Sequence, residues 1–393
     1  MDFPKWPHYS EDEIRIVETI LRSGKVNYWT GNTTKLFEKE FSNICECEYT
    51  IALANGSLAL SCAYLAIGLK KGDEIITTPR SFIATTSSAM LLGAMPVFAD
   101  IDRDSGNITS ETIEPLINKN TKALVVVHIG GWPADIIKIS KLAKKYNLFL
   151  IEDCSQAHGA SFTFKNSRIP VGKLGDISTW SFCQDKIIST GGEGGMIATN
   201  NKSFYEKIWS FKDHGKSIDK VKNNSKKFLS YRYIHDFLGS NFRITNLQSG
   251  IGLLQLKKLK LWNQIRSQNA EILTNELKDI KSIRIPKIPK NINHAWYKFN
   301  CFTNKNELKK GWDRDKIILE INSLGYPAFQ GSCSELYLEE CIKKNNKLKY
   351  KTLPIAKELG QNSICFLIHP TITKEIMYKY SKAIKNIILK ATK

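Results

Sequence analysis

The sequence predicts an α/β protein in which helices cover both faces of a mostly parallel sheet, with a smaller α/β domain after it. Between about residues 50 and 200, short apolar runs alternate with segments of helical periodicity, which is typical of strands connected by helices. The pattern continues more loosely in the last third of the chain. We therefore expect a large domain at residues 1–258 and a small domain at residues 259–393, as a length of 393 residues allows.

The individual elements follow from the period of the apolar residues. An amphipathic helix is expected near the N-terminus, with one face formed by Ile14, Val17, Ile20 and Leu21. The apolar runs predict strands at residues 49–54, 74–78, 96–100, 123–128, 148–152, 177–182 and 195–199. Periodic segments predict helices at residues 57–69, 81–92, 136–146 and 245–277. A last helix at residues 374–390 has one apolar stripe, made of Ile376, Met377, Tyr380, Ile384, Ile387 and Ile388.

The composition is that of an ordinary globular protein, with 42% hydrophobic and 24% charged residues. The net charge of +19 comes from lysines spread along the chain, without an arginine-rich arm or a zinc-finger spacing. We therefore expect a basic surface that attracts anionic small molecules and no nucleic-acid partner. The N-terminus lacks a signal pattern and the apolar runs are too short to span a membrane, so a cytoplasmic protein is expected. Nine cysteines without a C-x-x-C pair favour free thiols, and no metal site is expected.

Asn55-Gly56-Ser57 lies between a predicted strand and a predicted helix. A glycine at this turn lets the backbone approach a ligand closely, and the free N–H groups of the helix then face that ligand. The segment is therefore a candidate phosphate cradle. An ordinary strand-to-helix turn with a capping serine is the alternative.

An apolar strand at residues 148–151 is followed by Glu152 and Asp153. Ligands of open α/β sheets bind at the carboxyl ends of the strands, so a carboxylate there is placed to neutralise a buried cation. A helix cap or a solvated acid in a loop is the alternative interpretation.

Lys186 comes shortly after the strand predicted at residues 177–182 and just before a glycine-rich turn at residues 189–195. Its side chain is placed to project into the same cleft, where a neutral amine is able to form a Schiff base with a carbonyl compound. A surface lysine is the alternative in a chain so rich in lysine.

The three features occur in the order found in fold-type I enzymes that use pyridoxal phosphate (PLP): a phosphate cradle, a strand-end aspartate, and a lysine about 33 residues later. More narrowly, the chain resembles the DegT/DnrJ/EryC1/StrS family of sugar aminotransferases. The resemblance covers roughly residues 10–260 well and the C-terminal part loosely. It is carried by ANGSLAL at 54–60, GDEI at 72–75, PVFADID at 96–102, PAD at 133–135, EDCSQAHG at 152–159, GD at 175–176, the Lys186 segment with GEGGM at 192–196, and GSNFR at 239–243.

The resemblance implies a fold-type I aminotransferase whose large domain has a mixed, mostly parallel seven-stranded sheet. Lys186 would bind the cofactor covalently and then carry a proton during the reaction. Asp153 would pair with the pyridinium nitrogen and keep it protonated. Gln156 would hydrogen-bond the phenolic oxygen of PLP, and Phe82 would stack on its ring.

The resemblance also implies how the phosphate of PLP is held. Gly56, Ser57 and Ser181 would bind it, and Asn241 would reach the phosphate in the neighbouring subunit. A homodimer with shared active sites is therefore implied. The small-molecule partners would be a sugar and the glutamate/2-oxoglutarate pair.

Two segments depart from the family's pattern. Cys183-Gln184-Asp185 stands where many relatives have a His-Pro-type sequence, and residues 331–335 (GSCSE) replace a His-x-x-x-Tyr-like stretch of many nucleotide-sugar members. Both resemble the branch of 8-amino-3,8-dideoxy-manno-octulosonate transaminases. We expect transfer from glutamate to a nucleotide-linked keto-sugar for surface polysaccharide such as lipopolysaccharide, with an 8-oxo sugar acid as the alternative acceptor. Either anionic substrate needs a cationic group, and Arg80 and Arg243 are the candidates.

Two other functional classes fit the sequence less well. A PLP-dependent sugar dehydratase of the same fold would lack the reactive lysine, whereas Lys186 is present. A non-enzymatic regulatory protein would need an added DNA-binding module, for which the sequence leaves no evident room. His128 and His158 are interpreted as packed strand-end histidines rather than catalytic bases.

Overall fold

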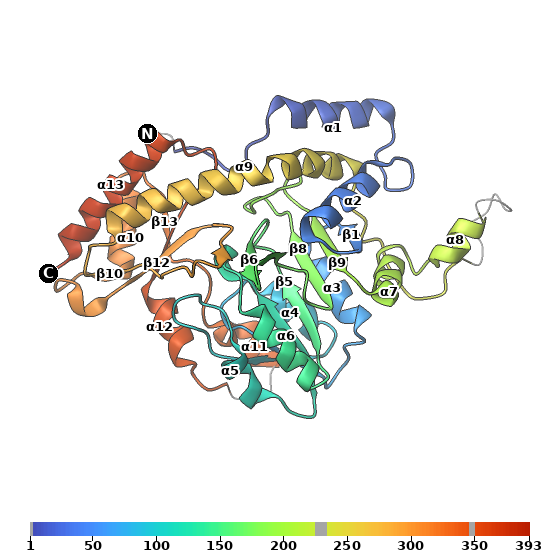
Figure 1. Ribbon diagram of the computed structural model, residues 1–393, viewed down its shortest axis with the longest axis horizontal. Helices are drawn as coiled ribbons and strands as arrows, with labels where there is room; N and C mark the ends of the chain where they lie inside the picture. Colours follow the sequence, from blue (N-terminus) through green and yellow to red (C-terminus); the bar gives the residue numbers. More distant parts are fainter. Residues whose placement is uncertain (1–2, 225–233, 346–349) are drawn as a thin grey trace.

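The computed structural model describes residues 3–224, 234–345 and 350–393 (Figure 1). Its helices are α1 (Glu11–Ser23), α2 (Thr33–Cys45), α3 (Gly56–Ala66), α4 (Ala84–Met90), α5 (Ser110–Ile113), α6 (Ile136–Lys145), α7 (Lys202–Lys212), α8 (Ile218–Asn224), α9 (Asn246–Leu277), α10 (Arg314–Ser323), α11 (Glu340–Asn345), α12 (Pro354–Asn362) and α13 (Lys374–Ala391). Its strands are β1 (Tyr49–Leu53), β2 (Glu74–Thr77), β3 (Met95–Phe98), β4 (Thr121–Val127), β5 (Phe149–Asp153), β6 (Ser161–Phe164), β7 (Ser167–Pro170), β8 (Ile177–Ser181), β9 (Gly195–Thr199), β10 (Ile283–Arg284), β11 (Ile292–Asn293), β12 (Phe299–Thr303), β13 (Ala328–Phe329) and β14 (Ser363–Phe366). None of the helices in these ranges has both the length and the hydrophobicity that a membrane span requires.

The central sheet has seven strands in the order β1-β9-β8-β5-β4-β2-β3. Strand β9 pairs antiparallel with both of its neighbours, and the remaining pairs are parallel. This confirms the predicted α/β class with a mixed, mostly parallel sheet. Val127 lies beside Asp153, and Asp153 lies beside Thr179, so the carboxyl ends of β4, β5 and β8 meet at one edge.

Helices cover both faces of this sheet because successive strand residues alternate between two cores. Ile75 packs in a core with side chains of α3 and α7, whereas the next residue, Ile76, packs with side chains of α6 and α12. Farther along the second face, α2 and α9 cover β1, β8 and β9. The sheet is therefore a central layer between helical layers, as the sequence predicts.

The C-terminal part of the chain builds its own core. A second sheet with the order β10-β12-β14-β13 is antiparallel throughout, and it packs against α10, α13 and the last part of α9. On α13, the predicted stripe faces this core: Met377, Tyr380, Ile384 and Ile388 are fully buried, and Ile376 and Ile387 partly so. Because α9 runs from one part into the other (Figure 1), a domain boundary at residue 258 stays a prediction.

The predicted face of α1 is wrong. Ile20 is buried, but Ile14 and Leu21 are more than half exposed. The helix lies along α9 (Figure 1) and turns Glu13 toward it, where Lys258 holds the carboxylate at 2.9 Å. Ile16 and Ile20 also lie against Gly250 of α9, so the face of α1 that packs on α9 includes Glu13, Ile16 and Ile20.

Candidate active site

The turn from β1 into α3 forms a cradle at the carboxyl edge of the sheet. Asn55 caps α3, since its side-chain oxygen accepts a hydrogen bond from Leu58 N at 2.9 Å. A Cβ atom on Gly56 would lie only 2.7 Å from the Cβ atom of Ser181, so the start of α3 and the end of β8 are in direct contact. Ser57 is exposed beside them. The cradle therefore combines a helix N-terminus with a hydroxyl group, which is a suitable site for a phosphate.

Asp153, at the end of β5, is a buried carboxylate with hydrogen-bond donors on both oxygens. It is 4% exposed, and Oδ2 accepts from the Thr85 hydroxyl at 2.9 Å while Oδ1 accepts from Ser155 N at 3.1 Å. Ser81 in turn contacts the Thr85 hydroxyl at 3.0 Å. Within the described ranges, no basic side chain forms an ion pair with Asp153. A cationic group of a ligand would supply the missing positive charge.

Lys186 follows β8, and its side chain is 15% exposed. Its Nζ atom lies 3.5 Å from Oδ1 of Asp185 and 5.2 Å from the ring centroid of Tyr297. The indole of Trp6 donates a hydrogen bond to the Lys186 carbonyl oxygen at 2.8 Å. The N-terminal segment therefore helps to fix the loop that carries this lysine.

Two adjoining cavities bring most of the candidate residues together. The first, of about 440 Å³, is lined by Gly56, Ser57, Phe82, Asp153, Gln156, Ser181 and Lys186. The second, of about 670 Å³, shares Phe82, Gln156 and Lys186 with the first and extends to the segment at residues 331–333. Lys186 thus lies where a cavity suited to a cofactor meets a cavity suited to a substrate.

Gln156 and Phe82 line both cavities in different ways. Oε1 of Gln156 accepts a hydrogen bond from Gly130 N at 2.7 Å, which leaves the NH₂ group of the amide to donate into the site. Phe82 is 69% exposed, an unusual position for a large apolar ring unless a flat ligand covers it.

Asn241 lies elsewhere. Its side chain is exposed and does not line either of the two cavities, and its Oδ1 accepts a hydrogen bond from Arg243 N at 3.3 Å. Within one chain it is therefore separated from the other seven candidates.

The two arginines proposed as substrate-binding cations are both engaged in the fold. Arg80 is 3% exposed, donates to the hydroxyl of Ser334 and lines a small cavity of about 40 Å³ that shares Lys298 and Asn300 with the larger cavity. Arg243 pairs with the buried Asp213 at 2.8 Å. Neither lines the cavities at Lys186, whereas Lys298 lines the larger one.

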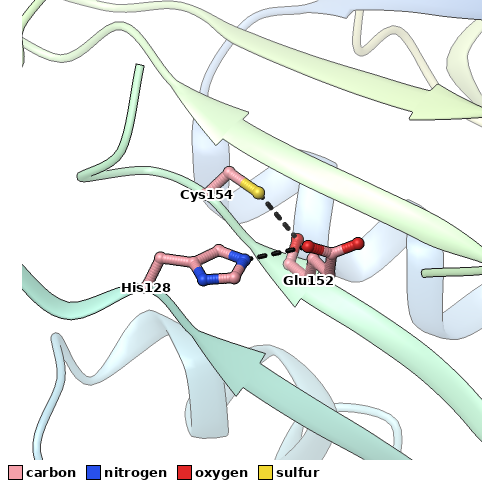
Figure 2. A group of neighbouring side chains, drawn as sticks. All are labelled: His128, Glu152 and Cys154. Atoms are coloured by element: carbon pink, nitrogen blue, oxygen red, sulfur yellow. Dashed lines mark hydrogen bonds and ion pairs between the residues drawn. The ribbon is translucent and has the colours of Figure 1, made fainter. Parts of the chain in front are cut away.

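His128, Glu152 and Cys154 form a buried cluster at the carboxyl ends of β4 and β5 (Figure 2). Nδ1 of His128 accepts from Ala134 N at 3.0 Å, so Nε2 carries the proton and donates to Glu152 at 2.9 Å. Glu152 also accepts from backbone N–H groups of the 172–175 turn. Burial raises the pKa of Glu152, but these hydrogen bonds outweigh it and lower the pKa below its usual value. With its donors and acceptors used, the cluster holds strands and turn together, and His128 is packed as predicted.

His158 is also packed rather than placed for catalysis. It is 1% exposed between the rings of Trp180 and Phe182, and both of its ring nitrogens lack a hydrogen-bond partner among the described residues. Burial lowers the pKa of His158 to about 3, so the imidazole is neutral at physiological pH.

PLP fits the residues present. The cradle that a Cβ atom would fill suits its phosphate, the buried Asp153 suits its pyridinium, and the exposed ring of Phe82 suits its flat face. An α/β protein with these features at the carboxyl edge of its sheet falls in the class of PLP-dependent aminotransferases.

Comparison with known proteins gives the family. The chain belongs to the DegT/DnrJ/EryC1/StrS aminotransferase family, whose model matches residues 7–385. The chain is 34% identical over 349 residues to GDP-perosamine synthase of Escherichia coli O157:H7, covering 88% of this chain and 87% of the relative. It is 32% identical over 364 residues to a pleiotropic regulatory protein of Geobacillus stearothermophilus, covering 92% and 90%. The crystal structure of an aminotransferase from Psychrobacter cryohalolentis matches with 41% identity and a TM-score of 0.94, covering 99% of each chain.

Several residues of the site were missed from the sequence. Thr85 lies one turn beyond Ser81 in a predicted helix, but nothing local marks it as a partner of Asp153. The sequence marks Asp185 only as part of a segment that departs from the family pattern, and it does not predict that Asp185 contacts Lys186. Tyr297 and Lys298 come more than 100 residues after Lys186, and only the tertiary structure brings them to it.

Proposed function

We propose that this aminotransferase moves an amino group from L-glutamate to the keto group of a nucleotide-linked sugar in surface polysaccharide biosynthesis. The 670 Å³ cavity beside Lys186 carries this proposal, because its size suits a sugar substrate next to the cofactor. The 34% identity to GDP-perosamine synthase over most of the chain supports the substrate class.

Bound PLP would supply the electron sink that allows an amino group and a carbonyl to be exchanged. Lys186 would hold the cofactor through its amine and later carry the proton between neighbouring carbon atoms of substrate and cofactor. Asp153 would keep the ring nitrogen protonated, because a buried carboxylate stabilises a cation beside it. Gln156 would orient the ring through its NH₂ group, and Phe82 would cover one face and exclude water.

The remaining proposed contacts hold the phosphate. The N–H groups of Gly56 and Ser57 and the hydroxyl of Ser181 would bind it within one chain, and Asn241 of a second copy would complete the site. The exposure of Asn241 supports a homodimer with shared sites, as do its exposed apolar neighbours Phe237 and Leu238, which are 59% and 94% exposed. We further propose that the dimer acts in the cytoplasm.

The amination of an 8-oxo sugar acid is the second candidate. It is favoured by the segment at residues 331–333, which departs from the nucleotide-sugar pattern and lines the larger cavity. The segment that distinguishes the two candidate functions would therefore be in contact with the bound substrate.

The experiment compares both acceptors with the PLP-loaded enzyme and glutamate, and measures 2-oxoglutarate formation. Turnover with a nucleotide-linked keto-sugar supports the first proposal, and turnover with the 8-oxo octulosonate alone replaces it with the second. Amination of neither, with exchange between simple amino acids and keto acids, would overturn the sugar assignment. Loss of all turnover despite the visible absorbance of bound PLP would favour a regulatory role.

A further inference from the structure

The two carboxylate oxygens of Asp185 contact different parts of the chain. Oδ1 faces Nζ of Lys186 at 3.5 Å. Oδ2 accepts a hydrogen bond from the hydroxyl of Tyr297 and lies 3.4 Å from Nζ of Lys298. Side chains of the segment just before β12 therefore fix one oxygen of Asp185, and the other oxygen faces Lys186.

The side chain of Lys186 is enclosed on two sides. The ring of Tyr297 lies 5.2 Å from Nζ, and rings at this distance attract a cation through their negative face. Asp185 lines both cavities, as Lys186 does. The carboxylate and the ring thus hold the amine at the junction of the two cavities.

Other charged or titratable groups face the same site. Asp153, Cys183 and Glu193 line the smaller cavity, Cys333, Cys341, Cys365, Glu339 and Lys298 line the larger one, and the buried His158 lies behind Lys186. Burial raises the pKa of Asp185, but the charge of Lys186, the hydrogen bond from Tyr297 and the charge of Lys298 outweigh it and lower the pKa. Asp185 is therefore an anion at neutral pH.

We propose that Asp185 is a positioning residue for Lys186, and that it sets how strongly the lysine nitrogen holds a proton. The resemblance to the family assigns Asp185 no role, because this residue belongs to a segment that departs from the expected family pattern. The proposal rests on the proposed function, in which Lys186 carries the cofactor and a proton. An anion at 3.5 Å stabilises the protonated nitrogen, and Lys298 opposes it by sharing the carboxylate and adding positive charge.

The test is a pH titration of the visible absorbance of the PLP-loaded enzyme, which changes when the nitrogen joining PLP to Lys186 gains or loses a proton. Asp185→Asn keeps the shape of the side chain and removes its charge. We expect the midpoint to fall by about one pH unit, the lower end of the effect of a charge at this distance, because the Asp185 side chain is half exposed. Asp236→Asn, which removes a surface carboxylate paired with Lys220, should leave the midpoint unchanged.

Two further variants separate charge from packing. Lys298→Met removes the opposing cation, so the midpoint should rise. Tyr297→Phe keeps the charge of Asp185 and loses one hydrogen bond, so it should shift the midpoint by less than half as much as Asp185→Asn. An unchanged midpoint in Asp185→Asn, or shifts of the same sign in Asp185→Asn and Lys298→Met, would overturn the proposal. A Lys186→Ala enzyme that still turns over would instead overturn the role of Lys186 in the proposed function and move it to another lysine.

Discussion

Gly56 and Ser181 lie so close together that a Cβ atom on the glycine would be 2.7 Å from the Cβ atom of the serine. Real carbon atoms that are not bonded do not approach this closely, so the contact requires a glycine. It brings the N-terminus of α3 and the hydroxyl of Ser181 to one point. The proposed phosphate cradle therefore depends on the absence of a side chain at residue 56.

We predict that Gly56→Ala weakens PLP binding by about 10- to 100-fold, which corresponds to roughly 1.4–2.8 kcal/mol. The added methyl group pushes α3 away from β8 and separates the groups that bind the phosphate. Cofactor titration of the purified variant measures the effect. Gly68→Ala is the control, because its positive φ of 70° strains the fold without touching the cradle. Equal affinities in the wild type and Gly56→Ala would show that the phosphate binds elsewhere.

Asp153→Asn should reduce kcat by about 10²-fold to several thousand-fold, since an unpaired buried cation costs roughly 3–5 kcal/mol. The fold should persist, because the amide oxygen can accept from Ser155 N while the amide NH₂ donates to the Thr85 hydroxyl, which is able to turn and accept. Thr85→Val removes one hydrogen bond to the carboxylate and should cost only about tenfold. Steady-state kinetics and melting temperatures are the measurements. Near-normal turnover in Asp153→Asn would make the residue a structural cap.

Lys186→Ala should abolish turnover, because no other amine takes the place of the lost nucleophile and proton carrier. Lys173→Ala is the matched control. Its amine pairs with Glu46 and it does not line either of the two cavities, so activity should be retained. Activity above a few per cent in Lys186→Ala, measured with saturating PLP, would move the assignment to another lysine.

The large sheet was predictable because each of its strands is a short apolar run that ends at a turn. Helix α2 was not predicted, although the apolar residues on its buried side recur at helical spacing and could have revealed it. These residues are Phe37, Phe41 and Cys45. The face of α1 was not predictable in this way, because its contacts with α9, among them the ion pair of Glu13 with Lys258, join residues that are far apart in the sequence.

The residues of the candidate site likewise differ in whether they belong to a local sequence motif or are brought together only by tertiary contacts. Asp153 and Lys186 stand in local motifs at strand ends, so their presence in one cavity follows from parallel strands. Arg80 stays a predicted substrate-binding residue, and its contact with Ser334 could not be predicted because the two residues lie 254 positions apart. The contacts of Asp185 with Tyr297 and Lys298 are equally non-local. Sequence patterns therefore place the proposed cofactor-binding residues better than the residues that line the larger cavity.

The buried His158 should make the protein less stable in mild acid. Its folded pKa of about 3 lies below the ordinary value of 6.5, so the unfolded chain binds the extra proton. Its contribution is complete above pH 6.5 and is lost as the pH falls toward 3. Between pH 7 and pH 5 this amounts to about 2 kcal/mol. His158→Leu should flatten the pH dependence of the melting temperature, and an unchanged dependence would exclude His158 as a cause.

Subunit mixing tests the proposed role of Asn241 in a partner's site. In a heterodimer of Lys186→Ala and Asn241→Ala chains, one of the two sites receives a native Lys186 and a native Asn241, and the other receives neither. Random exchange of equal amounts makes half of the dimers mixed, so about a quarter of all sites should be fully active. Activity at limiting PLP, where Asn241→Ala alone is weak, should therefore rise above the sum of the parents. Mass spectrometry of differently tagged chains verifies the exchange. If mixed dimers form and activity does not rise, Asn241 serves its own subunit.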